Sequence, residues 1–184
     1  MIKAFAALAF LFLASLPASA TEAGWALLRA GGHAVLLNHA RTAGMADPAH
    51  VDPEHCATQR PLDDRGQQQA RRIGALFAAR AAPTDEVVAS RFCRAKDTAR
   101  LAFGGTVEEL AALDPVPSDP AAAETQAQAV LERIRLFDGP GNLVLVTHAS
   151  TIQALTGQGA REGEAVIVRP EGERLRVLGR IVFN

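Results

Sequence analysis

Two histidines follow apolar runs that have the composition of buried strands. His39 comes shortly after the run 33–37, and His148 comes directly after the run 142–147. A third apolar run is followed by a segment that contains Arg94. A neutral imidazole, which is well populated near pH 7, can accept a phosphoryl group as a nucleophile. The fixed fork of donors on an arginine matches phosphate oxygens. Together the three side chains indicate phosphoryl chemistry.

Zinc binding is the alternative use of these histidines. Many zinc sites take two histidines from one helix at positions i and i+4, and this chain has no such pair. His50 and His55 lie in the segment 39–62 and could contribute ligands. The sequence therefore favours a site without a metal.

The elements around these residues are predicted from the spacing of apolar side chains. Helices are expected over 25–30, 67–81, 92–103 and 121–137 and from residue 151, strands over 33–37, 86–90 and 142–147, and a hairpin over 164–168 and 175–183. Residues 107–113 fit either a strand or a helix. Strands that alternate with helices predict an α/β fold with a mostly parallel sheet. We expect a three-layer sandwich with helices on both faces of this sheet.

Such a sheet binds its ligand beyond the carboxyl ends of the strands. His39, Arg94 and His148 all follow predicted strands, so they would meet at this edge. The segment 39–62 has no apolar period, and a loop of that length tends to be functional in a compact domain. The site is therefore expected to combine strand ends with one long loop.

Residues 1–20 have the features of a secretory signal peptide. Lys3 supplies the positive start, 4–16 are mostly apolar, and Ala18-Ser19-Ala20 is a small-residue cleavage site. A membrane anchor is the alternative, but a serine and a proline interrupt the run before it reaches about 20 apolar residues. We expect a single exported domain over 21–184, periplasmic or secreted, without a membrane span after cleavage.

Charge and cysteine content narrow the function classes further. The 184 residues carry a formal net charge of −1, which excludes a strongly basic nucleic-acid binder. The two cysteines, Cys56 and Cys93, could form a disulfide in an exported protein. The alternative is that both are free thiols, buried as small apolar groups.

Four segments carry a resemblance to a known family. They are Leu37–Thr42, Pro61–Ala70, Ser90–Ala99 and Val144–His148. In this order they resemble the Arg-His-Gly or Arg-His-Ala tripeptide, the Leu-Thr-x-x-Gly-x-x-Gln-Ala helix start, the Ser-x-x-x-Arg-Ala-x-x-Thr-Ala segment and the second-histidine strand of the histidine phosphatase (phosphoglycerate mutase-like) superfamily. The loop Cys56–Arg60 resembles that of small exported members similar to lipopolysaccharide core heptose phosphate phosphatases.

The resemblance implies a phosphatase that needs neither a metal nor an organic cofactor. His39 would attack phosphorus and become phosphohistidine, while His148 and Arg94 would hold the phosphate oxygens. The implied partner is a small-molecule or glycolipid phosphomonoester. Mutase activity and cytoplasmic signalling fit less well with a short chain that carries an export signal.

A general acid should protonate the leaving oxygen. Asp114 lies where the family's acid often lies, after the presumed third strand, and is the residue chosen here. Asp119, Glu108 and Glu109 are the neighbouring carboxylates that could replace it.

Asn38 departs from the family pattern, in which an arginine at this position clamps the phosphate. An asparagine offers only neutral donors on a shorter side chain. Losing one preorganised donor typically costs about 10² to 10³ in rate. We therefore expect either a slow phosphatase, with Asn38 and Arg41 contributing to phosphate binding and Arg91 as another substitute, or a phosphate-binding pseudoenzyme without turnover.

Overall fold

The computed structural model describes residues 20–44, 46–47 and 51–183. Residues 1–19 of the predicted signal segment lie outside this range, and so does His50. Within the described part of the chain, no helix combines the length and the apolar character needed to cross a membrane.

A six-stranded sheet forms the centre of the fold, in the order β3-β2-β4-β1-β5-β6. Its strands are β1 (Ala34–Asn38), β2 (Thr84–Ala89), β3 (Glu108–Glu109), β4 (Asn142–Thr147), β5 (Glu164–Glu171) and β6 (Arg174–Val182). The first four pair in parallel, and the hairpin β5–β6 joins antiparallel to β1. The predicted α/β fold with a mostly parallel sheet is confirmed.

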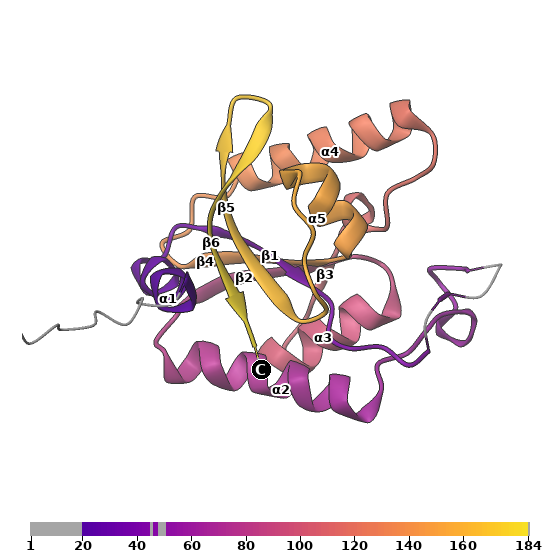
Figure 1. Cartoon of the computed structure of the whole chain (residues 1–184), viewed down its shortest axis with the longest axis horizontal. Coiled ribbons are helices and arrows are strands. Elements are labelled where there is room, and N and C mark those ends of the chain that lie inside the picture. Colours follow the sequence, from indigo (N-terminus) through magenta and orange to yellow (C-terminus); the bar gives the residue numbers. More distant parts are fainter. Residues whose placement is uncertain (1–19, 45, 48–50, 184) are drawn as a thin grey trace, which may run out of the picture.

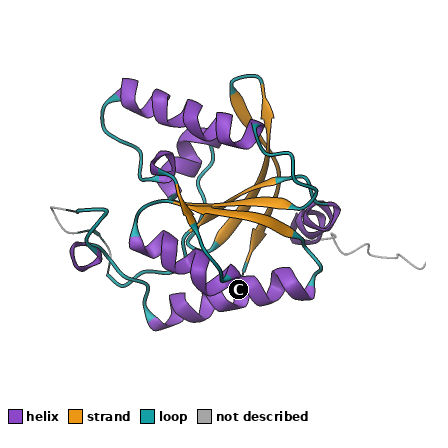
Figure 2. Cartoon of the chain, turned by 180° about the vertical axis from the view of Figure 1, so that it is seen from behind, coloured by secondary structure: helices purple, strands orange, loops and turns teal. Residues whose placement is uncertain are grey.

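Helices cover both faces of this sheet (Figures 1 and 2). On one face lie α1 (Ala20–Ala30), α2 (Asp64–Ala79) and α3 (Cys93–Phe103), and on the other lie α4 (Pro120–Arg135) and α5 (Ala149–Thr156). Side chains of β1 alternate between the two layers: Val35 and Leu37 pack with the first set, and Leu36 packs with the second. This alternation produces the three predicted layers.

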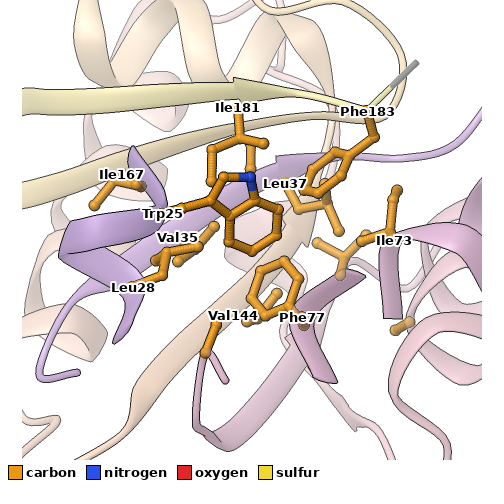
Figure 3. Packing of buried hydrophobic residues seen from close by; sticks show 14 of the residues in the cluster. Trp25, Leu28, Val35, Leu37, Ile73, Phe77, Val144, Ile167, Ile181 and Phe183 are labelled. Carbon is orange, nitrogen blue, oxygen red and sulfur yellow. The ribbon is translucent and has the colours of Figure 1, made fainter. Parts of the chain in front are cut away.

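Trp25 stands at the centre of the core that includes α1 (Figure 3). Its indole meets Phe77 and Phe183 edge to face, with ring centroids 5.6 and 5.8 Å apart. Edge-to-face pairs contribute about 0.5–1.5 kcal/mol beyond the area they bury. The helix predicted over 25–30 begins earlier, at Ala20, so its first turn extends before the apolar side chains that signalled it.

The strand register brings the functional residues together. Asn38 pairs with Thr147 in the parallel β1–β4 ladder, and the next amide, that of His39, donates to the Thr147 carbonyl at 3.0 Å. On the other side of β4, the Ser90 amide donates to the Val146 carbonyl at 2.9 Å. Three strand ends therefore lie side by side, and His39, Ser90 and His148 leave the sheet at one edge.

The start of α2 is packed against the chain that follows His39. The carboxylate of Asp63 caps the helix by accepting from the Gly66 amide at 2.7 Å. A Cβ on Gly66 would lie 1.9 Å from the Arg41 carbonyl oxygen, so only glycine permits this approach.

Short 3₁₀ turns complete the connections near the site. The first, Cys56–Thr58, lies in the long loop after β1, which projects from one side of the domain in Figure 1. The ambiguous segment 107–113 divides into the two-residue strand β3 and a second 3₁₀ turn, Ala111–Leu113.

Candidate active site

His39 is held with one ring nitrogen prepared for attack. It is 5% exposed, and its Nδ1 lies 2.9 Å from the Ala40 carbonyl oxygen. A carbonyl can only accept, so Nδ1 carries the proton and Nε2 carries the lone pair. Burial, followed by the positive charges of Arg94 and Arg60, lowers the pKa of His39 to about 4, against an opposing effect of the Ala40 carbonyl. The imidazole is therefore neutral at pH 7.

His148 faces His39, with ring centroids 5.3 Å apart. Its Nε2 lies 2.8 Å from the Ser90 hydroxyl, which itself donates to Asp114 at 2.8 Å and accepts from the Phe92 amide. Because the hydroxyl proton points to Asp114, His148 donates through Nε2. Its Nδ1 is buried and has no hydrogen-bond partner among the described residues. Burial first, and then the nearby positive groups, lower the pKa of His148 well below its usual value.

Asp114 reaches His148 only through Ser90. Its Oδ1 accepts from the Ser90 hydroxyl and from the Arg91 amide at 2.9 Å, and its Oδ2 accepts from the Arg91 Nε and Nη2 at 2.8 and 2.7 Å. Both oxygens are thus engaged, and Arg91 is committed to Asp114. The predicted role of Asp114 as general acid stays a prediction, and the contacts observed are those of a positioning residue.

The other candidate acids are engaged away from the histidines. The Asp119 carboxylate caps α4 by accepting from the Ala122 amide at 3.0 Å. Glu109 pairs with Lys96 at 3.2 Å, and Glu108 lies 3.7 Å from Arg133.

Arg94 joins His39 to an acidic side chain. Its guanidinium is almost fully buried, and its Nε donates to His39 Nε2 at 3.2 Å. Its Nη1 and Nη2 donate to the two carboxylate oxygens of Asp47, both at 3.1 Å. This is the bidentate arrangement that an arginine also makes with phosphate. The site thus contains an anion-binding fork that a carboxylate of the same chain occupies.

Asn38 and Arg41 are placed differently from His39 and Arg94. Asn38 is 1% exposed, and its Nδ2 donates to the Ala160 carbonyl at 3.1 Å, whereas its Oδ1 has no partner among the described residues. The Arg41 side chain is 51% exposed and pairs with Asp63 at 2.9 Å. Its guanidinium is therefore turned to the solvent-exposed start of α2 and does not join the two histidines, so the structure does not place it as a phosphate clamp.

The possible disulfide between Cys56 and Cys93 is present, with Cα atoms 5.6 Å apart. It fastens the long loop to the first residue of α3, next to Arg94. The Gln59 side chain strengthens this connection, because its Oε1 accepts from the Cys93 amide at 2.8 Å.

Metal ligation has little support in the part of the chain that is described, where no group of three or more His, Cys, Asp or Glu side chains could hold an ion. His55 is exposed and pairs with Asp52 at 2.7 Å.

The site thus combines a buried histidine pair with an arginine fork, at the carboxyl edge of a mostly parallel sheet in an α/β protein. Residues 35–116 match the family described as Histidine phosphatase superfamily (branch 1). The match spans 82 of the 184 residues, so over this segment the chain is similar to that superfamily. The matched segment includes His39 and Arg94 but ends before His148. A search among curated proteins found no match.

Several solved structures share the fold. A phosphoserine phosphatase from Entamoeba histolytica in complex with phosphoserine is 12% identical, with a TM-score of 0.60 over 83% of this chain and 98% of that one. The α-ribazole phosphatase from Shigella flexneri is 17% identical, with a TM-score of 0.60 over 80% and 96%. Phosphoglycerate mutase from Thermus thermophilus is 21% identical, with a TM-score of 0.57 over 83% and 99%. At these identities the likeness concerns the fold.

Proposed function

We propose that this protein hydrolyses a phosphomonoester through a phosphohistidine on His39. The observation that carries the proposal is the state of this ring: Nδ1–H is fixed on the Ala40 carbonyl, and the Nε2 lone pair lies beside the Arg94 guanidinium. A neutral, oriented imidazole next to an anion fork is what an attack on phosphorus requires.

The reaction follows in two displacements. His39 Nε2 attacks phosphorus, so the N–P bond forms while the bond to the ester oxygen breaks, and the departing oxygen takes up one proton from the solvent. The Arg94 Nε–H, which now donates to Nε2, turns to a phosphate oxygen. The positive charge that develops on the ring is stabilised by the Nδ1–H bond to Ala40. Water then attacks phosphorus, the N–P bond breaks, and phosphate and neutral His39 are released with one proton.

His148 takes a phosphate oxygen from the opposite side. Its unpartnered Nδ1 is the atom left for this contact, since Ser90 holds Nε2. A phosphate dianion beside the ring raises its pKa and favours the imidazolium, which can donate from both nitrogens. Ser90 and Asp114 then hold the charged ring in place. Asp114 acts as a positioning residue in this scheme.

The substrate and the compartment are further parts of the proposal. The disulfide supports an oxidising compartment, and residues 1–20 have the pattern of an export signal. A periplasmic or secreted enzyme would act on a small-molecule or glycolipid phosphomonoester, in line with the resemblance of Cys56–Arg60 to lipopolysaccharide core heptose phosphate phosphatases.

A phosphate-binding pseudoenzyme is the second candidate. Asn38 favours it, because its amide donates to the Ala160 carbonyl and brings no positive charge to a phosphate.

Hydrolysis of a generic aryl phosphate tests both candidates. We expect the wild type to release phosphate and, after an alkaline quench, to carry an acid-labile, base-stable phosphoryl group on His39. His39→Ala should lose at least about 10³ in kcat, and His148→Ala about 10² to 10³. His33→Ala, at the opposite end of β1, is the matched control and should keep full activity.

Two results would contradict the phosphatase mechanism. An adduct that persists in folded His39→Ala would place the nucleophile elsewhere. A wild type that binds phosphate without turnover would establish the pseudoenzyme.

A further inference from the structure

One buried arginine lies in the site, and it carries a single positive charge. A phosphomonoester carries nearly two negative charges. Arg94 supplies that arginine, and Asn38 cannot supply another. Arg41 and Arg91 are each paired with an aspartate outside the histidine pair. If the protein binds phosphate strongly, a further cation must face the same position.

Arg60 is the candidate for this cation, because it lies close to the same carboxylate, that of Asp47, as Arg94 does. The Asp47 Oδ1 lies 3.1 Å from Arg94 Nη1 and 3.5 Å from Arg60 Nε, so two guanidinium groups converge on one oxygen. The backbone amide of Arg60 also donates to this oxygen, at 3.4 Å. Arg60 Nε is buried and has no hydrogen-bond partner among the described residues. It is a donor that faces an anion without yet bonding to it.

The field of Arg60 reaches each reacting group. Its positive charge contributes to the lowered pKa of His39, of His148 and of Arg94. Both histidines and the fork therefore lie within its electrostatic range. The contacts to Asp47 place Arg60 beside the Arg94 fork, within electrostatic range of both histidines.

The loop holds Arg60 firmly in this position. Its Nη1 donates to the Gly44 carbonyl at 3.3 Å, and the preceding residue, Gln59, accepts from the Cys93 amide. The Cys56–Cys93 disulfide lies four residues before Arg60 and one residue before Arg94. The same covalent link thus positions both arginines.

We infer that Arg60 and Arg94 together form the phosphate clamp, with Arg60 taking the place of the missing arginine at position 38, and that the Asp47 carboxylate occupies the clamp when no phosphate is bound. The inference rests on the proposed function, because it names the groups that bind the phosphate in that site. A carboxylate carries one negative charge and a phosphomonoester carries nearly two, so phosphate can displace Asp47 while both arginines keep an anionic partner.

Burial of the reacting groups supports the displacement. His39, Arg94 and His148 are 5%, 3% and 3% exposed, whereas the Asp47 side chain is 29% exposed. Asp47 thus covers the fork from the solvent side, and a phosphate that reaches His39 must take its position.

Three variants test the clamp, with inorganic phosphate as the probe. Arg60→Gln should weaken phosphate binding about tenfold and lower kcat/KM for an aryl phosphate by about 10² to 10³, since it removes a preorganised cationic donor. Arg60→Lys should recover part of both. Asp47→Asn should bind phosphate several-fold more tightly, because the competing charge is gone. Arg176→Gln, which breaks an exposed pair with Glu171 on the hairpin, is the matched control and should change neither value.

Phosphate affinity and kcat/KM together distinguish a failure of this inference from a failure of the proposed function. Calorimetric binding of phosphate does not depend on turnover, so an inactive wild type whose phosphate affinity still falls in Arg60→Gln would overturn the phosphatase and keep the clamp. An active enzyme in which folded Arg60→Gln keeps phosphate affinity and kcat/KM within twofold would overturn the clamp alone. Weaker phosphate binding in Asp47→Asn, at unchanged melting temperature, would overturn the role of Asp47.

Discussion

The two sides of the site are built in different ways. One side consists of Ser90, Asp114 and His148, which leave the sheet or follow it closely and are joined by hydrogen bonds of 2.8 Å. The other side consists of Asp47 and Arg60, which come from the long loop after β1 and are attached through the Cys56–Cys93 disulfide and ion pairs. We call them the strand side and the loop side.

The two sides differ in whether a bound anion could replace the present partners of their polar side chains. On the strand side, the side chains of Ser90 and Asp114 are hydrogen-bonded to groups of the protein. Of the buried polar side-chain atoms of Ser90, Asp114 and His148, all of which the structure describes, the one without a hydrogen-bond partner is His148 Nδ1. On the loop side the arginines have a partner, Asp47, that an anion of higher charge can replace. Under the proposed function the strand side orients the His148 ring, and under the inferred Arg60–Arg94 clamp the loop side adjusts how tightly an anion is held.

Removal of the disulfide should separate the two sides most strongly. We expect Cys56→Ser with Cys93→Ser to lower the free energy of unfolding by up to about 3–4 kcal/mol, the chain-entropy value for two cysteines 37 residues apart. Phosphate affinity should fall as well, because Arg60 loses its attachment. Urea unfolding and phosphate titration measure the two effects. Unchanged values for the double variant would show that the loop needs no covalent attachment, and a reductant should affect only the wild type.

Acid should weaken the junction of the two sides, where the histidines meet. His39 has a pKa of about 4 in the folded protein and about 6.5 when unfolded, so between these values the unfolded chain binds more protons. The free energy of unfolding is therefore unaffected by His39 above pH 6.5. It declines as the pH falls towards 4, by about 3 kcal/mol from the protonation of His39. Urea unfolding from pH 7.5 to 4.5 should show the decline. His148, whose pKa burial also lowers, contributes a decline of the same sign, so His39→Asn should reduce the slope without removing it. A slope that His39→Asn leaves intact would mean that His39 is not the buried neutral group.

A smaller effect on kcat should follow when the hydrogen bonds that link His148 to Asp114 through Ser90 are removed. Ser90→Ala removes the acceptor for His148 Nε2 and should lower kcat about tenfold with little change in KM, the effect expected for one hydrogen bond to a group that becomes charged. Asp114→Asn should act through the same contact. The double variant should then be no slower than the slower single variant.

An acid role for Asp114 predicts a different outcome. The effects of Ser90→Ala and Asp114→Asn would multiply, and Asp114→Asn alone would remove one limb of the kcat–pH profile.

Residues in regular elements were predictable, because their environment repeats along the chain. The strand 142–147 has the predicted bounds. His39, Arg94 and His148 converge, since parallel strands end at one edge of the sheet. Arg41 was assigned by its position along the chain, and position does not tell where a flexible arginine points. The acid role of Asp114 was assigned in the same way and stays a prediction.

The loop side could not be predicted from local patterns. Asp47 meets Arg94 across 47 residues of sequence, in a segment without apolar periodicity. The cysteines were the only sequence signal of where this loop runs, since a disulfide between Cys56 and Cys93 brings the residues around position 60 close to Arg94. Following that constraint would have selected Arg60 in preference to Arg41 and Arg91.

The Arg94 Nε–H bond to His39 Nε2 has a consequence for the chemical selectivity of the resting protein. A lone pair that accepts a hydrogen bond from a buried guanidinium is shielded from acylating and alkylating electrophiles, which cannot draw that donor away. A phosphate ester can, because its own oxygens are better acceptors for Arg94. If His39 is the nucleophile that we propose, the group it attacks is also the group that uncovers it. We expect a nonspecific reagent to modify the exposed imidazole of His55 before His39.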